Sequence, residues 1–302
     1  MISGQKNDES QAVALATRLF SVSLIKELAQ KGRSSLFAEL AGELSTLKPN
    51  PFLKCASSGE LFDCAFNFLK KKDYRLEYIY KSAIAHKVLM GVHSLKTATM
   101  INEFRVGNNK ADSVILNGTS TVYEIKSERD SLIRLEHQLD AYQKVFAKVN
   151  VIVGEKHLAA VLKLVPKEVG ILLLSDRYQI SSVRDAIDMA ANTNVGVIFD
   201  SIRLSEAKKI LELEGVVIPQ VPNTLLAQTL RKEFIKLTSL QAHSGMVSVL
   251  RESRSHRPLS EFIGMLPSSI QLAALSISFN KMDKQRLILA LNTPINNALK
   301  WN

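Results

Sequence analysis

Two carboxylates and a lysine lie in two short apolar runs separated by a turn. Asp112 opens the first run, and Glu124 and Lys126 close the second. Asn117 and Gly118 between the runs favour a hairpin, because both residues tolerate a positive φ. Side chains alternate along a strand, so Glu124 and Lys126 share one face. The pattern predicts a polar cluster on one face of a β-hairpin.

The register of this hairpin decides whether the cluster forms. A two-residue loop places Asp112 opposite Tyr123, with the two acids on different faces of the hairpin. A three-residue loop pairs Leu116 with Ser120 and brings Asp112 opposite Glu124. We therefore predict the three-residue loop.

Carboxylates at bonding distance repel each other unless they share a cation. A hard ion with oxygen ligands, Mg²⁺ or alternatively Mn²⁺, suits Asp112 and Glu124 as metal ligands. Such an ion could polarise a phosphodiester and lower the pKa of a bound water, while Lys126 positions that water. The residues predict metal-assisted phosphodiester hydrolysis. The alternative is a solvated strand edge, which often carries a Glu-X-Lys triplet.

Eleven residues separate Asp112 from Glu124-Ile125-Lys126, and this arrangement resembles the signature of the PD-(D/E)XK nuclease superfamily. Gln138 and Tyr142 resemble part of its second core helix. More narrowly, the chain resembles a bacterial branch found among phage-defence and mobile-element genes. Ala111 departs from the pattern, because it stands where the superfamily name has proline.

The resemblance implies a fold, a substrate and further site residues. The implied fold is α/β, with a restriction-endonuclease-like αβββαβ core and a mixed sheet, and the implied substrate is DNA. Gln138 is expected to support catalysis. Another acid is expected beside the metal ligands. Glu103, in a strand-like run, is slightly favoured over Glu77, in a preceding helix, and both could instead be ordinary surface residues.

Apolar periodicity outlines the elements around the cluster. Asp130 or Ser131 is expected to cap a helix with an apolar stripe through Leu135. Arg134 and Gln138 flank the stripe and are predicted to contact a phosphate or a metal-bound water, with a solvated helix face as the alternative. The other predicted elements are helices at 77–92, 155–165 and from 204, and strands at 99–106, 112–116, 121–125, 149–153, 169–174 and 195–199, within a sheet of four or five strands.

Three consecutive domains are expected. Residues 1–75 form a helical cap, with breaks at Gly32 and at 49–51. Residues 76–222 form the nuclease-like α/β core. Residues 223–302 form a basic helical domain, with breaks near glycine and proline residues: Gly245, Pro258, Pro267 and Pro294.

Basic charge is concentrated near the C-terminus. The formal net charge of the chain is +10. From residue 225 onward there are 10 Lys or Arg and 4 Asp or Glu, which gives this segment a net charge of +6. Arg251, Arg254 and Arg257 are the densest group and are predicted, with Arg134, to contact nucleic-acid phosphates. A solvated helical face is the alternative reading of this charge.

Other classes of function find little support in the sequence. No apolar run approaches the length of a membrane span, and the polar start of the chain predicts a cytoplasmic protein. Cys55 and Cys64 lack the CxxC spacing, so we expect them to be reduced packing residues. No P-loop, GxSxG or HExxH motif occurs.

The sequence thus predicts a Mg²⁺-dependent endodeoxyribonuclease, with bacterial antiphage defence as its expected setting. Homodimerisation or a partner subunit is an open alternative, because many enzymes of the resembled superfamily cut DNA only in such assemblies. A different class of function is also open: a non-catalytic regulator, binding nucleic acid or a partner, on a nuclease-like fold.

Overall fold

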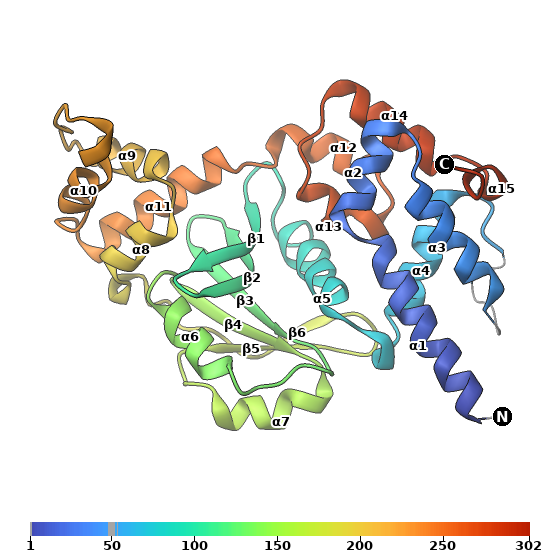
Figure 1. The fold of residues 1–302 in the computed structure, drawn as a ribbon. Helices are drawn as coiled ribbons and strands as arrows, with labels where there is room; N and C mark the ends of the chain where they lie inside the picture. The colour runs from blue at the N-terminus through green and yellow to red at the C-terminus, as the bar shows by residue number, and fades with distance from the viewer. Residues whose placement is uncertain (1, 48–51, 53) are drawn as a thin grey trace. The chain divides into compact units, whose positions relative to one another are not determined.

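The computed structural model describes residues 2–47, 52 and 54–302 (Figure 1). Its contacts divide the chain into two compact units. The first unit combines Met1–Ser82 with Leu259–Asn302, and the second is Ala83–Pro258. The three consecutive domains expected from the sequence do not coincide with these units, and that division stays a prediction.

The second unit is built on a six-stranded mixed sheet with the order β1-β2-β3-β4-β5-β6. The β3–β4 and β4–β5 pairs are parallel and the other pairs are antiparallel. The α/β class is therefore confirmed, while the restriction-endonuclease-like core stays a prediction. The strands are β1 (Thr99–Val106), β2 (Asn109–Leu116), β3 (Ser120–Lys126), β4 (Lys148–Val153), β5 (Gly170–Leu174) and β6 (Ile180–Arg184).

The predicted hairpin register is confirmed. Leu116 pairs with Ser120, so the loop has three residues, and Gly118 adopts a φ of 70°. The Asn117 N–H donates to the Thr119 carbonyl at 3.0 Å and closes the loop. A positive φ suits glycine because it has no Cβ.

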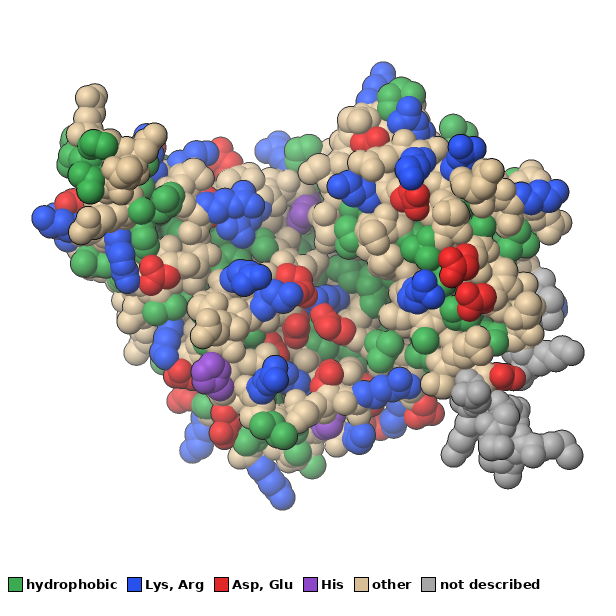
Figure 2. Space-filling view, viewed as in Figure 1, with side chains coloured by type: hydrophobic (Ala, Val, Ile, Leu, Met, Phe, Trp, Pro, Cys, Tyr) green, Lys and Arg blue, Asp and Glu red, His purple; other side chains and the backbone are tan. Residues whose placement is uncertain are grey.

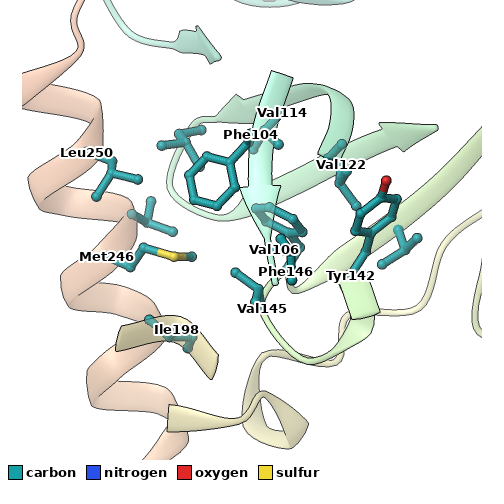
Figure 3. Packing of buried hydrophobic residues seen from close by; sticks show 14 of the residues in the cluster. Phe104, Val106, Val114, Val122, Tyr142, Val145, Phe146, Ile198, Met246 and Leu250 are labelled. Atoms are coloured by element: carbon teal, nitrogen blue, oxygen red, sulfur yellow. The ribbon is translucent and has the colours of Figure 1, made fainter. Parts of the chain in front are cut away.

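Helices bury one face of this sheet. The Phe104 and Phe146 ring centres lie 5.3 Å apart. Figure 3 shows Leu250 facing Phe104 and Val122 beside Tyr142. The apolar cluster that these residues join includes side chains from α6, α7, α8, α9, α10 and α11. The helices of the second unit are η2 (Ile84–Leu89), α6 (Leu135–Gln143), α7 (Glu155–Leu164), η3 (Ala190–Asn192), α8 (Val195–Ser201), α9 (Leu204–Leu213), α10 (Asn223–Phe234) and α11 (Ser239–Ser253).

The first unit is helical, as expected for residues 1–75, but it also contains the C-terminal helices. Ser21, Ser34 and Ser57 cap helices through their hydroxyls, and Gly32 ends one with a φ of 74°. The expected break at 49–51 lies outside the described residues. The helices are α1 (Ile2–Leu19), α2 (Val22–Lys31), α3 (Ser35–Thr46), α4 (Ser58–Leu69), η1 (Lys72–Tyr74), α5 (Glu77–Ala83), α12 (Ser260–Met265), α13 (Ser268–Leu275), α14 (Lys281–Leu291) and α15 (Ile295–Ala298), with η4 (Arg257–Leu259) before α12.

Hydrogen bonds join the two sequence segments of the first unit. The Ser58 N–H donates to the Thr293 carbonyl at 3.0 Å, and the Ile295 N–H donates to the Ala56 carbonyl at 2.9 Å. The ring of Trp301 lies 5.3 Å from the ring of Phe37. The C-terminal segment is therefore an integral part of this unit.

Two sequence predictions about elements are wrong. Residues 195–199 form helix α8, because the Asn194 side chain accepts the Val197 N–H at 3.0 Å and starts a helix. Gly245 lies inside α11 and does not break it. A Cβ at Gly245 would lie 2.6 Å from the Ile210 Cγ2 atom, so this glycine allows close packing of α9 on α11.

Two predicted helices have different ends in the structure. The helix expected at 77–92 consists of α5 followed by a π-helical segment that ends at Leu89. The helix expected after residue 130 begins at Leu135. Asp130 does not cap it, because its carboxylate accepts the N–H and the hydroxyl of Ser127, both at 2.7 Å.

Candidate functional site

Strand β3 and helix α6 bring four polar residues together, which we call the Glu124 network: Glu124, Lys126, Gln138 and Tyr142. Lys126 Nζ donates to Glu124 Oε1 at 2.7 Å and to Gln138 Oε1 at 2.9 Å. The Tyr142 hydroxyl donates to Glu124 Oε2 at 3.0 Å. Both oxygens of Glu124 therefore accept hydrogen bonds from the chain itself.

Asp112 lies beside this network but is held by a backbone group. The last paired residues of the β2–β3 ladder are Ser113 and Tyr123. Asp112 is the next residue of β2 away from the hairpin loop. Beyond this pair, Asp112 Oδ2 accepts the Ile125 N–H at 2.7 Å, in place of a ladder carbonyl. The two predicted metal ligands thus occupy opposing positions on neighbouring strands.

The Glu124 network is nearly closed to solvent. Glu124 is 1% exposed and Lys126 is 7% exposed. Burial raises the pKa of Glu124, and the adjacent Lys126 charge opposes this rise. Burial, together with the negative charge of Glu124, raises the pKa of Tyr142, so its hydroxyl stays a donor. Figure 3 shows the Tyr142 ring in the apolar cluster, so this residue serves both packing and the network.

The two candidates for the additional acid form ion pairs. Glu77, in the first unit, pairs with Lys81 at 2.5 Å. Glu103, in the second unit, pairs with Lys110 and has a φ of 60°, a strained value for a residue other than glycine. Each acid therefore has a cationic neighbour in its own unit, and the choice between them stays a prediction.

A second polar feature is the basic hollow, a 630 Å³ cavity beside the C-terminal turns of α11. Its charged lining residues are Lys96, Arg251, Arg257 and Glu252. None of the three cations forms an ion pair with another residue in the described part of the chain. The hollow therefore carries uncompensated positive charge.

Helical periodicity explains why α11 presents polar groups to the hollow. Ser248, Arg251 and Glu252 lie three and four residues apart on its exposed side, and all three line the hollow. Ser255, which follows the end of α11, also lines it. Met246 and Leu250 lie on the buried side. Lys96 comes from the loop before β1, and no sequence motif marked it as a site residue.

The remaining predicted arginines lie elsewhere. Arg254 Nε and Nη2 donate to Glu206 at 2.9 and 2.8 Å, and its guanidinium lies 5.4 Å from the Phe104 ring centre. Arg254 therefore joins α11 to α9 and does not line the hollow. Arg134 is exposed at the N-cap position of α6. Whether Arg134 contacts nucleic acid stays a prediction.

A profile of the family described as "Bacteriophage P4 protein cII" matches residues 70–264. The chain belongs to this family. "Protein cII" of Enterobacteria phage P4 is 27% identical over 217 residues, which cover 70% of this chain and 76% of the phage protein. No solved structure matches the chain. The matched residues include the whole second unit, with the Glu124 network and the basic hollow.

This match corrects two predictions. The resemblance to the PD-(D/E)XK superfamily and its bacterial phage-defence branch is wrong, because the family found is that of a phage protein. The prediction of a DNA-cleaving endonuclease, a hydrolase, is wrong with it. Glu124 and Lys126, which motivated that prediction, form a buried ion pair with each other. An aspartate and a Glu-X-Lys triplet on a hairpin therefore did not identify the family.

Candidate membrane spans were not found: every helix in the described residues is too short or too polar to cross a bilayer.

Proposed function

We propose that this protein is a regulator that binds nucleic acid without cleaving it and that the basic hollow is its contact with phosphates. The observation that carries the proposal is the convergence of Lys96, Arg251 and Arg257 on one cavity, where none of them has an ion-pair partner among the described residues. Neighbouring like charges repel, and an anionic ligand relieves that repulsion. Cationic side chains supply most of the sequence-independent affinity for nucleic acids.

The positive charge proposed to bind phosphates is confined to the basic hollow and does not extend over a broad surface. Figure 2 shows basic and acidic side chains interspersed on the visible face. A broad field of one sign is therefore absent from that view, and a discrete site is the better interpretation. Residues 223–258 contain six Lys or Arg and two Asp or Glu. Two of these six cations line the hollow.

The test is binding of labelled duplex DNA, single-stranded DNA and RNA, measured by fluorescence anisotropy over a range of salt concentrations. A Lys96→Ala, Arg251→Ala, Arg257→Ala variant should bind more weakly and show a shallower salt dependence, by up to ~0.9 in log-log slope for each phosphate that the variant no longer neutralises. A control variant replaces Lys163 and Lys167, two exposed lysines at and after the end of α7, with alanine.

The control should keep the wild-type salt slope, and both variants should keep the wild-type thermal melting temperature. The nucleic acids should also be recovered intact from every reaction. A triple variant that binds as tightly as the wild-type protein, with the same salt slope, would show that phosphates do not bind at the hollow.

We also keep Mg²⁺, with Mn²⁺ as the alternative, as a proposed ligand of Asp112 and Glu124. Support comes from their opposing positions on β2 and β3 and from the preference of these ions for carboxylate oxygens. An ion there would share Glu124 with Lys126 and Tyr142. Mg²⁺ should raise the melting temperature of the wild-type protein but not that of Asp112→Asn. An equal rise in both would remove the proposal.

A second candidate function, self-association, is favoured by an apolar surface in the second unit. A 530 Å³ cavity is lined by the loop between α9 and α10, and Val217 in that loop is 89% exposed. Leu213 and Leu225 nearby are 65% and 48% exposed. Exposed apolar groups of this kind often mark interfaces. Light scattering should show a dimer that Val217→Asp converts to monomer, and a wild-type monomer at all concentrations would exclude it.

A further inference from the structure

The shape of the basic hollow indicates a compact ligand. Its 630 Å³ volume lies within the range of roughly 300–1,000 Å³ typical of small-molecule pockets. A duplex backbone presents its phosphates along a convex rod, whereas a cavity of this size can enclose one phosphate and its sugar. The volume therefore suits a ligand more compact than a stretch of double helix.

The charge of the hollow fits a doubly charged phosphate. Three cations and the single acid Glu252 line it, which leaves a formal charge of +2. A phosphodiester carries one negative charge, whereas a phosphate monoester carries about −1.5 to −2 at neutral pH. The terminal phosphate of a chain or of a nucleotide therefore matches this charge better than an internal diester.

The uncharged lining points to the same chemistry. Thr97, Ser248 and Ser255 line the hollow, and serine and threonine hydroxyls are suitable donors to phosphate oxygens. No aromatic side chain lines the hollow in the described part of the chain, so it offers no platform for stacking a base. Recognition then depends on the phosphate and is independent of base sequence.

We propose that the basic hollow binds a phosphate monoester, either at the end of a nucleic-acid chain or on a free nucleotide. The inference rests on the proposed function only in using the same three cations. A competing role for Arg251 is to stabilise the last turn of α11 through the helix dipole. Binding measurements separate the two roles, because a dipole contact does not respond to a terminal phosphate.

The experiment compares one oligonucleotide in three forms, with a 5′-phosphate, with a 3′-phosphate and with hydroxyls at both ends. Anisotropy with the full chain should show at least one phosphorylated form binding about tenfold more tightly, or about 1.4 kcal/mol. Arg251→Ala should abolish this advantage, while Ser248→Ala should reduce it and leave the charge unchanged. Lys163→Ala with Lys167→Ala should keep it.

A calorimetric arm distinguishes the source of the phosphate. Adenosine monophosphate is titrated against adenosine, with inorganic phosphate as a further probe. Equal affinity of all three oligonucleotides, with no heat from the monophosphate, overturns the inference and leaves the proposed function standing. Binding of the monophosphate but of no oligonucleotide supports the inference and overturns the proposed function. Binding of neither class of ligand overturns both.

Discussion

Lys126 and Glu124 form an ion pair that is almost completely withdrawn from water. Replacing Lys126 with methionine keeps most of the side-chain volume but leaves the Glu124 charge buried without its partner. We expect a loss of about 3–5 kcal/mol in the free energy of unfolding, measured by urea denaturation at pH 7. Adding Glu124→Gln should recover much of the loss, because the double variant no longer buries a charge.

An exposed pair provides the control for this prediction. Lys110 and Glu103 also form an ion pair, but their side chains are 53% and 41% exposed. Lys110→Met should therefore cost only about 0–1 kcal/mol. Similar losses in the Lys110 and Lys126 variants would show that Lys126 does not compensate the buried charge of Glu124.

Two histidines, the buried His243 and the partly buried His256, predict that the second unit becomes less stable in acid. Burial lowers the pKa of His243 and of His256 below the ordinary value of 6.5. The unfolded chain therefore binds more protons below pH 6.5, and stability falls as the pH drops through the folded pKa values, by at most about 1.4 kcal/mol per pH unit for each imidazole. Urea denaturation between pH 8 and 5 measures this slope.

The contacts of His243 suggest a variant for the same measurement. Its Nε2 lies 2.8 Å from the Ser120 hydroxyl oxygen, which accepts the Ala147 N–H at 3.0 Å. The serine proton is thus available to a neutral imidazole. His243→Gln can keep a hydrogen bond to Ser120 without titrating, so its stability should vary less with pH. An unchanged pH slope would contradict the role given to His243.

At the scale of elements, Arg254 and Arg251 give opposite expectations although they lie one turn apart on α11. Arg254 binds Glu206, whose side chain is 3% exposed, and joins α11 to α9. Burial raises the pKa of Glu206, but the hydrogen bonds from Arg254 and the Arg203 backbone outweigh it, so the net effect lowers this pKa. Arg254→Ala should therefore cost about 3–5 kcal/mol in the free energy of unfolding.

Arg251→Ala should change stability by no more than about 0.5 kcal/mol, because this side chain is exposed and has no ion-pair partner in the described residues. Guanidinium denaturation of the two variants tests the contrast. Equal losses would mean that Arg251 also stabilises the end of α11, and the interpretation of its binding phenotype would have to change.

Five of the six strands of the second unit could be predicted from the sequence. β1, β2, β3, β4 and β5 all overlap the predicted strand runs, although β2 begins three residues earlier than expected. The requirement that Asp112 lie opposite Glu124 selected the three-residue loop, and this register is correct. The run 195–199 was misassigned because a short apolar segment does not reveal its period, and the Asn194 cap decided it. β6 was missed because its residues are polar or partly exposed and show no apolar pattern.

The candidate site was predicted only in part. Glu124 and Lys126, two residues apart on β3, do meet in the structure. Gln138 and Tyr142, one turn apart on α6, both contact this pair. Lys96 and Arg251 are far apart in the chain, and only the tertiary fold brings them to one cavity. The roles of Arg251 and Arg254 could not be separated either, because burial distinguishes them and the sequence pattern does not.

At the scale of the whole molecule, the discontinuous first unit makes a prediction about truncation. A chain ending at Pro258 would lack residues 259–302, which contribute hydrogen bonds and the Trp301 ring to the N-terminal part of the unit. Limited proteolysis with mass spectrometry should then find cleavage throughout residues 1–82, while the second unit stays protected. Protection of both regions would instead support an autonomous C-terminal domain, as the sequence suggested.

The split composition of the first unit also bears on how the protein is made. A ribosome releases the N-terminal helices first, but the helices that complete their unit follow only after all of residues 83–258. At the usual rates of translation that interval is on the order of ten seconds. Throughout it, apolar faces such as that of Phe37 lack their final neighbours. We therefore expect chaperones to bind the nascent chain. Slow elongation across residues 83–258 would lengthen the time for which these apolar faces are exposed.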